Sequence, residues 1–305
     1  MKKVGILAVA AAILATAIGL TIYFVGFHNR GFPVGQIVRV IDGDTVELGR
    51  VGGGMFPNTA GTIEVRLLGV DAPDDCSQSD CLCQWKDEST TYLEQRHSST
   101  HFLVELYGQE GHNRWLAILR PTGAKVPSLN EQIVRDGYAL IYKVGDSQLG
   151  TPPTFEKGSL LEEDAGILRA LQDSLLAAQV QAALSRNGMW SEEKYDDGVH
   201  IIAMRYWGAD ECVVLGNFGT SAASLSALQV RDDAPKRPST ITVGDVTLQA
   251  GETVSVLCPS RTWRDVKVND GTSDNEDKST KAFLIDLAAD PSGSQTASDY
   301  CYRGF

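Results

Sequence analysis

The sequence lacks an excess of positive charge. Its 305 residues include 27 lysines and arginines against 39 aspartates and glutamates, which gives a net charge of −12 at neutral pH. This balance excludes a protein that attracts nucleic acid through its overall electric field, so such an activity would need a local basic patch or a bound metal ion. The chain also has no internal repeat and no low-complexity tract. Its length is typical of about two domains.

Cysteine is also scarce, and the six cysteines form two groups of three: Cys76, Cys81 and Cys83, then Cys212, Cys258 and Cys301. Three cysteines cannot all pair with one another, so either one disulfide joins the two groups or each group keeps a free thiol. His97 and His101 follow the first group, but its spacing is not one of the usual zinc patterns. Disulfides are the favoured interpretation in an exported protein.

One uncharged stretch of 24 residues, Val4–Phe27, follows Lys2-Lys3. A membrane-spanning helix needs about 20 apolar residues, whereas the apolar part of a signal peptide has about 7–15. We therefore predict a single-pass signal anchor through residues 4–27, with the lysines in the cytoplasm and the body outside at the cell membrane. The alternative is cleavage after Ala17 and secretion. Both alternatives export the body of the protein.

Strand and helix patterns alternate after a spacer that ends at about residue 34. Residues 36–48 alternate apolar and polar positions around a turn at Asp42-Gly43, which predicts two strands. We expect further strands at 63–70 and 115–119, and helices at 91–106, 128–136 and 168–184. The short middle helix opens with the spacing of a capping box, Ser128-Leu-Asn-Glu131. The order of these strands and helices predicts a small barrel of strands with interleaved helices over residues 35–193.

Helical periodicity disappears after a charged linker at 191–198. Short strand patterns separated by turn signals fill residues 199–305 and predict an all-β sandwich. We expect its strands at 199–203, 212–216, 226–230, 253–258, 266–268 and 282–286. We find no catalytic constellation in this region.

The first strands carry the residues with the most chemical information. Val40-Ile-Asp-Gly-Asp-Thr-Val46 is followed twenty residues later by Arg66-Leu-Leu-Gly-Val-Asp-Ala-Pro-Asp-Asp75. Two carboxylates, Asp44 and Asp71, thus end two predicted strands beside an arginine. Such residues can hold a hard divalent cation against a phosphate.

These segments resemble the staphylococcal nuclease-like (thermonuclease) family, an OB-fold barrel that hydrolyses phosphodiesters with calcium. Five segments match in the order of the family: Asp42–Thr45, Arg66–Pro73, Asn113–Ala117, Leu129–Gly137 and Gly188–Glu192. The resemblance implies Ca²⁺ bound by Asp44, Asp71 and the main-chain carbonyl of Ala72. It also implies that Arg66 and Arg114 bind phosphate.

Three positions depart from the pattern of the family. The family has a water-activating glutamate where this chain has Asp74, which is one methylene shorter, and the adjacent Asp75 is a possible substitute. Gly111 and His112 replace a lysine and a tyrosine, which predicts weak substrate binding. His112 either stacks on a base or covers the barrel. Tyr142 lies near a tyrosine of the family's nucleotide pocket, or is an aromatic residue at a strand end.

Residues 199–305 resemble the lamin-tail domain, an immunoglobulin-like sandwich, through Asp210–Asn217, Leu225–Leu228 and Leu248–Val256. This resemblance implies binding of an unknown ligand or protein. The sequence as a whole predicts an exported calcium-dependent nuclease that cleaves DNA or RNA with little sequence specificity and leaves 3′-phosphates. The alternatives are an inactive binding module at the cell surface and, with the weakest support, a redox or zinc protein built on the first three cysteines.

Overall fold

The computed structural model describes residues 32–54, 56, 61–73, 83–96, 100–109, 114–123, 126–142, 162–205, 212–232, 240–257, 281–286 and 300–301. The predicted anchor at residues 4–27 lies outside these ranges. Within them, no helix is both long enough and apolar enough to span a membrane.

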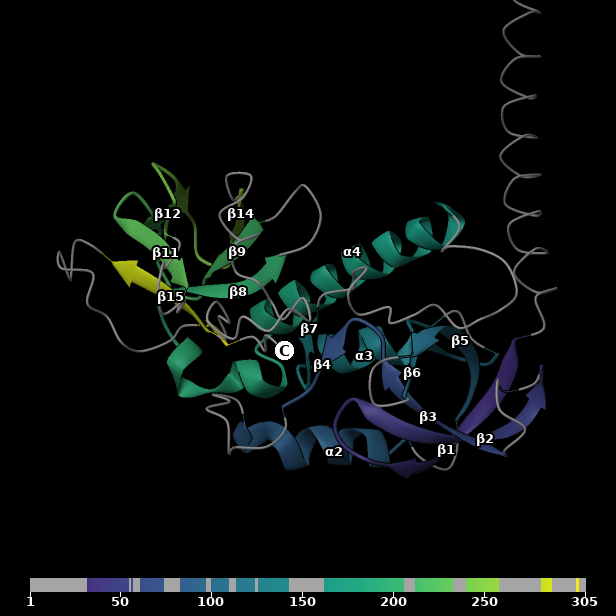
Figure 1. Ribbon diagram of the computed structural model, residues 1–305. Coiled ribbons are helices and arrows are strands. Elements are labelled where there is room, and N and C mark those ends of the chain that lie inside the picture. The colour runs from purple at the N-terminus through teal and green to yellow at the C-terminus, as the bar shows by residue number, and fades with distance from the viewer. Residues whose placement is uncertain are drawn as a thin grey trace, which may run out of the picture.

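A closed five-stranded barrel forms the first half of the protein (Figure 1). Its strands are β1 (Pro33–Val40), β2 (Thr45–Gly53), β3 (Thr62–Leu67), β5 (His101–Gln109) and β6 (Trp115–Pro121). They follow the order β1-β2-β3-β6-β5, in which only the β3–β6 pair is parallel. This is an OB-type barrel accompanied by helices, as the sequence predicted.

Alternation of side chains along the strands fills the barrel. Val46, Leu48, Val65 and Val104 are fully buried, and on β2 the partly exposed Glu47 and Gly49 alternate with Val46 and Leu48. Closure leaves none of the five strands with a free edge.

The helix expected at residues 91–106 is confirmed only in its first part, up to Glu94. Helix α2 spans Lys86–Glu94, and residues 101–106 of the predicted helix belong to strand β5. Phe102 and Val104 are buried while His101 is exposed, a period of two that satisfies the sheet. Pairing with both β1 and β6 outweighs the helical spacing of the apolar residues in this segment.

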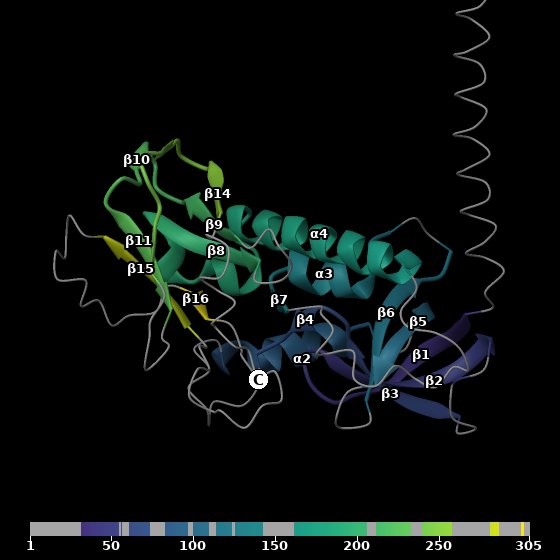
Figure 2. The same ribbon diagram turned by 45° about the horizontal axis from the view of Figure 1, so that its top comes forward.

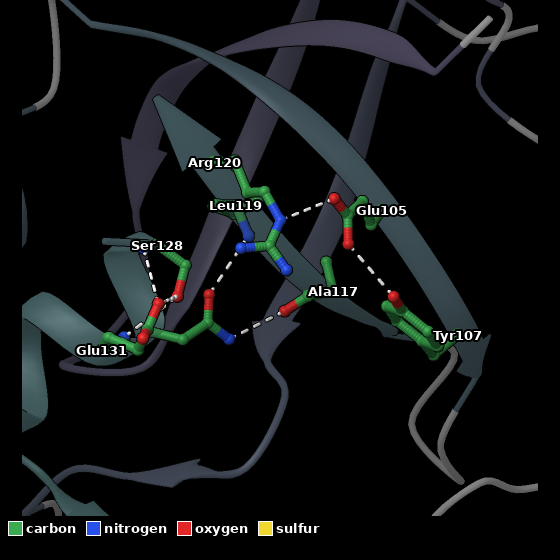
Figure 3. A network of polar contacts seen from close by, with 8 residues as sticks. Glu105, Tyr107, Ala117, Leu119, Arg120, Ser128 and Glu131 are labelled. Atoms are coloured by element: carbon green, nitrogen blue, oxygen red, sulfur yellow. Dashed lines mark hydrogen bonds and ion pairs between the residues drawn. The ribbon is translucent and has the colours of Figure 1, made fainter. Parts of the chain in front are cut away.

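Helix α3 (Leu129–Arg135) starts with the predicted capping box. The Ser128 hydroxyl accepts a hydrogen bond from the amide of Glu131, whose carboxylate accepts from the Ser128 amide, as Figure 3 shows. Asn130 is fully buried, and its Nδ2 donates to the carbonyls of Leu68 and Ala117. These bonds fix α3 across the end of β3 and the middle of β6.

An ion pair between the buried Glu105 and the half-exposed Arg120 lies beside this helix on the barrel wall (Figure 3). Arg120 Nε donates to Glu105 Oε1 at 2.7 Å, and the Tyr107 hydroxyl donates to Glu105 Oε2 at 3.1 Å. The pair joins the neighbouring strands β5 and β6. It lies on elements that carry no predicted site residue, so we assign it a structural role.

The long helix α4 (Glu162–Leu184) lies against α3. In both views it extends toward the second half of the chain, which begins with strand β8 (Val199–Arg205) (Figures 1 and 2). It ends where the sequence predicted, although it begins six residues earlier. Its buried face includes Leu171, Leu175, Ala178 and Ala182.

The described residues between 199 and 301 form two antiparallel sheets and a small two-stranded ladder. One sheet contains β14 (Thr253–Leu257), β9 (Cys212–Asn217) and β8 (Val199–Arg205). The other contains β12 (Thr240–Thr242), β11 (Leu228–Asp232), β15 (Lys281–Asp286) and β16 (Tyr300–Cys301). Strands β10 (Ala223–Ser224) and β13 (Thr247–Leu248) form the ladder. The predicted strand at 266–268 lies outside the described residues.

The segment that joins the two halves is packed. It forms two short 3₁₀ turns, η3 (Gly188–Ser191) and η4 (Glu193–Tyr195). Trp190 and Tyr195 are buried, and the ring of Tyr195 contacts His200 of β8 at a centroid distance of 5.3 Å. The charged residues that suggested a linker therefore surround an aromatic contact between the halves.

Candidate active site at one end of the barrel

Strand pairing brings the motif segments to one end of the barrel. Thr45 pairs with Arg66 across β2 and β3, and Val65 pairs with Trp115 across β3 and β6. Asp44 and Arg114 directly precede β2 and β6, so both lie at the end of β3 that carries Arg66. Strand β4 (Val70–Asp71) follows β3 after a two-residue turn and adds Asp71.

The Asp42–Thr45 turn requires its glycine. A Cβ atom at Gly43 would lie 2.6 Å from the Cβ of Ala72 and 2.7 Å from the Cβ of Ser89. The turn therefore passes between α2 and the end of β4. This close approach brings Asp44 next to Ala72, 28 residues further along the chain.

Arg66 links the two predicted metal-binding carboxylates. Its Nη2 atom lies 3.0 Å from Asp44 Oδ2 and 2.8 Å from Asp71 Oδ1. The exposed fractions of the three side chains are 8% for Arg66, 4% for Asp44 and 12% for Asp71. Buried charges of this kind depend on one another, because removing one partner leaves the other uncompensated in a medium that solvates it poorly.

Further hydrogen bonds orient Asp44. Its Oδ1 accepts from the Thr45 hydroxyl at 2.9 Å, and its Oδ2 accepts from the amide of Ala72 at 3.0 Å. Arg114 Nη1 lies 3.5 Å from the same Thr45 hydroxyl, at the outer limit of a hydrogen bond. Thr45 thus connects the second arginine to the cluster, a role that the sequence did not predict.

Asp42 is a further member of the cluster that the sequence analysis did not single out. Its Oδ1 accepts from the amide of Asp44 at 3.0 Å. Burial, followed by repulsion from Asp44, raises the pKa of Asp42 to about 6. Only the three-dimensional structure shows this burial, because Asp42 belongs to a turn that the sequence suggests is exposed.

Tyr142 lies beside Arg66 and is buried, with 5% of its surface exposed. The Arg66 guanidinium carbon is 6.0 Å from the centre of the tyrosine ring, at the limit of a cation–π contact. The Tyr142 amide donates to the carbonyl of Gly69 at 2.8 Å. This position supports the interpretation of Tyr142 as a strand-end aromatic more directly than a role in stacking on a base.

Two predicted site residues, Asp74 and His112, lie outside the described residues, as does Asp75. The structure therefore brings together Asp44, Arg66, Asp71, Ala72, Arg114 and Tyr142. Cys83, which begins the 3₁₀ turn η2 (Cys83–Trp85), is disulfide-bonded.

The residues of the cluster have the donor chemistry that calcium requires. Two carboxylates already share one cationic atom, Arg66 Nη2, and carboxylate oxygens are the usual ligands of this ion. Within the described ranges no three His, Cys, Asp or Glu side chains gather as a metal site. A calcium ion here would therefore need main-chain carbonyls and water as its other ligands, which this ion accepts.

A separate surface pocket of about 260 Å³ lies on α2 and has no residue in common with the cluster. Its lining includes Asp87, Glu88, Tyr92 and Tyr138. The two carboxylates would repel a phosphate, so this pocket does not extend the candidate active site.

Comparison with protein families agrees with this geometry. Residues 64–166 match the family model described as staphylococcal nuclease homologue. The match covers about a third of the chain and begins within β3, so β1, β2 and Asp44 precede it. The barrel continues the matched region toward the N-terminus and supplies that carboxylate.

The chain therefore contains a staphylococcal nuclease-like domain, and proteins of this family are typically nucleases. This class makes a nucleic acid a plausible substrate. No curated protein matches the chain.

Proposed function

We propose that the protein is a calcium-dependent nuclease that hydrolyses phosphodiester bonds of DNA or RNA with little sequence specificity. The observation that carries this proposal is the buried ion-pair cluster of Arg66 with Asp44 and Asp71, with Arg114 joined through Thr45. Barrels need no such group of charges for stability, because well-packed apolar residues would serve as well.

Asp44, Asp71 and the carbonyl of Ala72 would hold the ion. When bound, calcium supplies a positive charge that polarises a phosphate and favours attack by water. Arg66 and Arg114 bind the phosphate, and their planar guanidinium groups offset the charge that develops on its oxygens. Asp71 and Asp44 orient Arg66 through their two ion pairs.

Asp74 is the proposed base that takes the proton of the attacking water. The water displaces the 5′-oxygen, so the product keeps a 3′-phosphate. Asp74 is one methylene shorter than the glutamate of the family, and a displacement of about 1 Å can cost on the order of a hundredfold in rate. We therefore expect slower turnover than a glutamate would give.

We also propose that residues 4–27 anchor the protein in the cell membrane with its body outside the cytoplasm. The second half of the chain is proposed to be a lamin-tail-like, immunoglobulin-like sandwich that binds a ligand or a protein. Its two antiparallel sheets support the sandwich. At the end of β9, the Asn217 side chain donates to the carbonyls of Ser221 and Leu248, so Asn217 has a structural role.

The test is digestion of single-stranded DNA and RNA by the full-length protein with calcium and with excess chelator. We expect products with 3′-phosphate ends in calcium alone. Arg114→Ala should reduce the rate by about a hundredfold or more, because it removes charge from the transition state. Arg39→Ala is the matched control, since this barrel arginine is exposed and pairs with Glu47 away from the cluster.

The contrary outcome is equally specific. If neither nucleic acid is cut under any of these conditions while the protein is folded, the barrel is a binding module. Equal loss of activity in Arg39→Ala and Arg114→Ala would remove the assignment of Arg114 to the site.

A further inference from the structure

One side chain of α4 connects the two halves of the molecule. Gln179 is fully buried, and its Oε1 accepts from the amide of Ile141 at 2.6 Å. Its Nε2 donates to the carbonyl of Ile202 at 2.9 Å. Ile141 belongs to β7 (Leu140–Ile141) beside the barrel, and Ile202 belongs to β8 of the second half.

Strand β7 leads directly to the candidate active site. It pairs only two residues with β4, matching Ile141 with Val70 and Leu140 with Asp71. Asp71 is the carboxylate that pairs with Arg66. The next residue, Tyr142, donates its amide to Gly69 at the turn before β4. Every step between Ile202 and Asp71 is therefore a main-chain pairing or a buried hydrogen bond.

The β4–β7 pair is too short to be stable without support from neighbouring residues. Two-stranded pairs of ordinary length are marginal in water, and β4 and β7 have only two residues each. An apolar residue at position 179 would leave the buried Ile141 amide and Ile202 carbonyl without this partner, at a cost of about 1–3 kcal/mol for each group. Gln179 thus stabilises the strand pair that carries Asp71.

A second set of contacts, made by Arg186 just after the end of α4, also connects this helix to the second half. Arg186, just beyond α4, donates from Nε to the carbonyl of Trp190 at 3.0 Å and from Nη1 to the carbonyl of Tyr195 at 2.6 Å. Its guanidinium also lies 5.7 Å from the centre of the Phe218 ring in the second half. The second half is therefore fixed against α4 at two places.

We propose that Gln179 is a positioning residue through which docking of the second half holds Asp71 in the candidate active site. The assignment of Asp71 to a metal site rests on the proposed function, whereas the mechanical link does not. The second half then has a part in forming the site, in addition to any ligand that it binds.

The direct test is native-state hydrogen exchange of the full-length protein, followed by mass spectrometry. Gln179→Met removes both hydrogen bonds with little change of volume. We expect amides in 68–73 and 139–142 to exchange at least about tenfold faster, as loss of about 1.4 kcal/mol or more of local stability requires. Amides of β1 and β2 should keep the exchange rates of the parent.

Two further variants make the result specific. Asn217→Ala removes a buried amide whose hydrogen-bond partners, Ser221, Leu248 and Gly219, all lie in the second half, so exchange in 139–142 should stay unchanged. Gln179→Glu should restore most of the protection, because burial favours the protonated acid, which has the same acceptor and donor as glutamine. If Gln179→Met does not fold, Gln179→Asn takes its place, because its amide is one methylene shorter and cannot reach both partners. Faster exchange confined to 68–73 and 139–142 supports the proposal, and exchange like that of the parent in these segments overturns it.

The proposal is overturned if Gln179→Met leaves exchange in 68–73 unchanged, or if it accelerates all barrel strands equally. It is also overturned if Gln179→Glu loosens the barrel as a whole. Calcium titration separates this proposal from the proposed function. A parent protein that binds no calcium would refute the metal site, and the exchange pattern would still decide the mechanical link.

Discussion

At the scale of single residues, the chemistry of the molecule depends on charges that are removed from water. Arg66 is the positive partner of Asp44 and Asp71, and both of its ion pairs are largely shielded from solvent. Short motifs in the sequence are enough to find these residues and Arg114. The contributions of Thr45 and Asp42 could not be predicted, because they depend on which side of the turn faces the barrel.

Replacing Arg66 should expose this dependence. Arg66→Met leaves two buried carboxylates close together, so the free energy of unfolding in chelator should fall by about 3 kcal/mol. Calcium should recover part of the loss by supplying the missing positive charge. The measurement is urea unfolding with and without calcium. Arg39→Met, an exposed arginine, should stay within about 0.5 kcal/mol of the parent, and a failure of calcium to stabilise Arg66→Met would contradict the metal site.

Asp42 should give stability an unusual dependence on pH. Because its folded pKa of about 6 lies above the ordinary value of 3.8, the folded state binds more protons between these values. The contribution of Asp42 to stability therefore falls as pH rises from 3.8 through 6 and is lowest above that window. Asp42→Asn should raise the free energy of unfolding by about 1–2 kcal/mol at pH 8 in chelator and change it little near pH 4. Equal effects at both pH values in urea unfolding would contradict this explanation.

At the scale of elements, local signals in the sequence were reliable and long-range ones were not. The capping box of α3 and the end of α4 could be predicted because neighbouring residues determine them. Residues 101–106 could not, because their apolar spacing fits a helix and only pairing with β1 and β6 selects a strand. Gln179 lies 38 residues from Ile141 and 23 from Ile202, and no sequence pattern indicates such contacts.

The cap of α3 offers a test at this scale. Ser128→Ala removes the acceptor of the Glu131 amide, so the free energy of unfolding should fall by about 1 kcal/mol. Asn130 lies within the first turn, so amides near its partners Leu68 and Ala117 should also exchange faster. The control is Ser191→Ala, since Ser191 is exposed and bonds only locally to Gly188. Equal losses in the two variants would argue against a special role for the cap.

At the scale of the whole molecule, the negative net charge repels a nucleic acid, whereas the positive charge at the candidate site attracts it. The chain as a whole is strongly acidic, while two arginines gather at one end of the barrel. Substrate binding should therefore rely on few phosphate contacts. Helix α4 also bonds to both halves through Gln179, and by our proposal the second half thereby supports the candidate site.

Salt dependence reports the number of phosphate contacts. With two arginines as the main contacts, the logarithm of the binding constant for single-stranded DNA should fall with the logarithm of salt concentration at a slope of about −1 to −2. The measurement is fluorescence anisotropy with the slow Arg114→Lys variant in calcium, which keeps the charge. A slope steeper than about −4 would indicate an extended basic surface and contradict this view.

The central claim is that Asp44, Asp71, Arg66 and Arg114 form one calcium-dependent centre for phosphodiester cleavage. Its most direct test is the calcium concentration that gives half-maximal cleavage of single-stranded DNA, compared between the parent and Asp71→Asn. We predict no cleavage in chelator and at least a tenfold higher calcium requirement for Asp71→Asn, because one of the two carboxylate ligands is lost. Cleavage that persists in chelator, or an unchanged calcium requirement in the variant, would contradict the account.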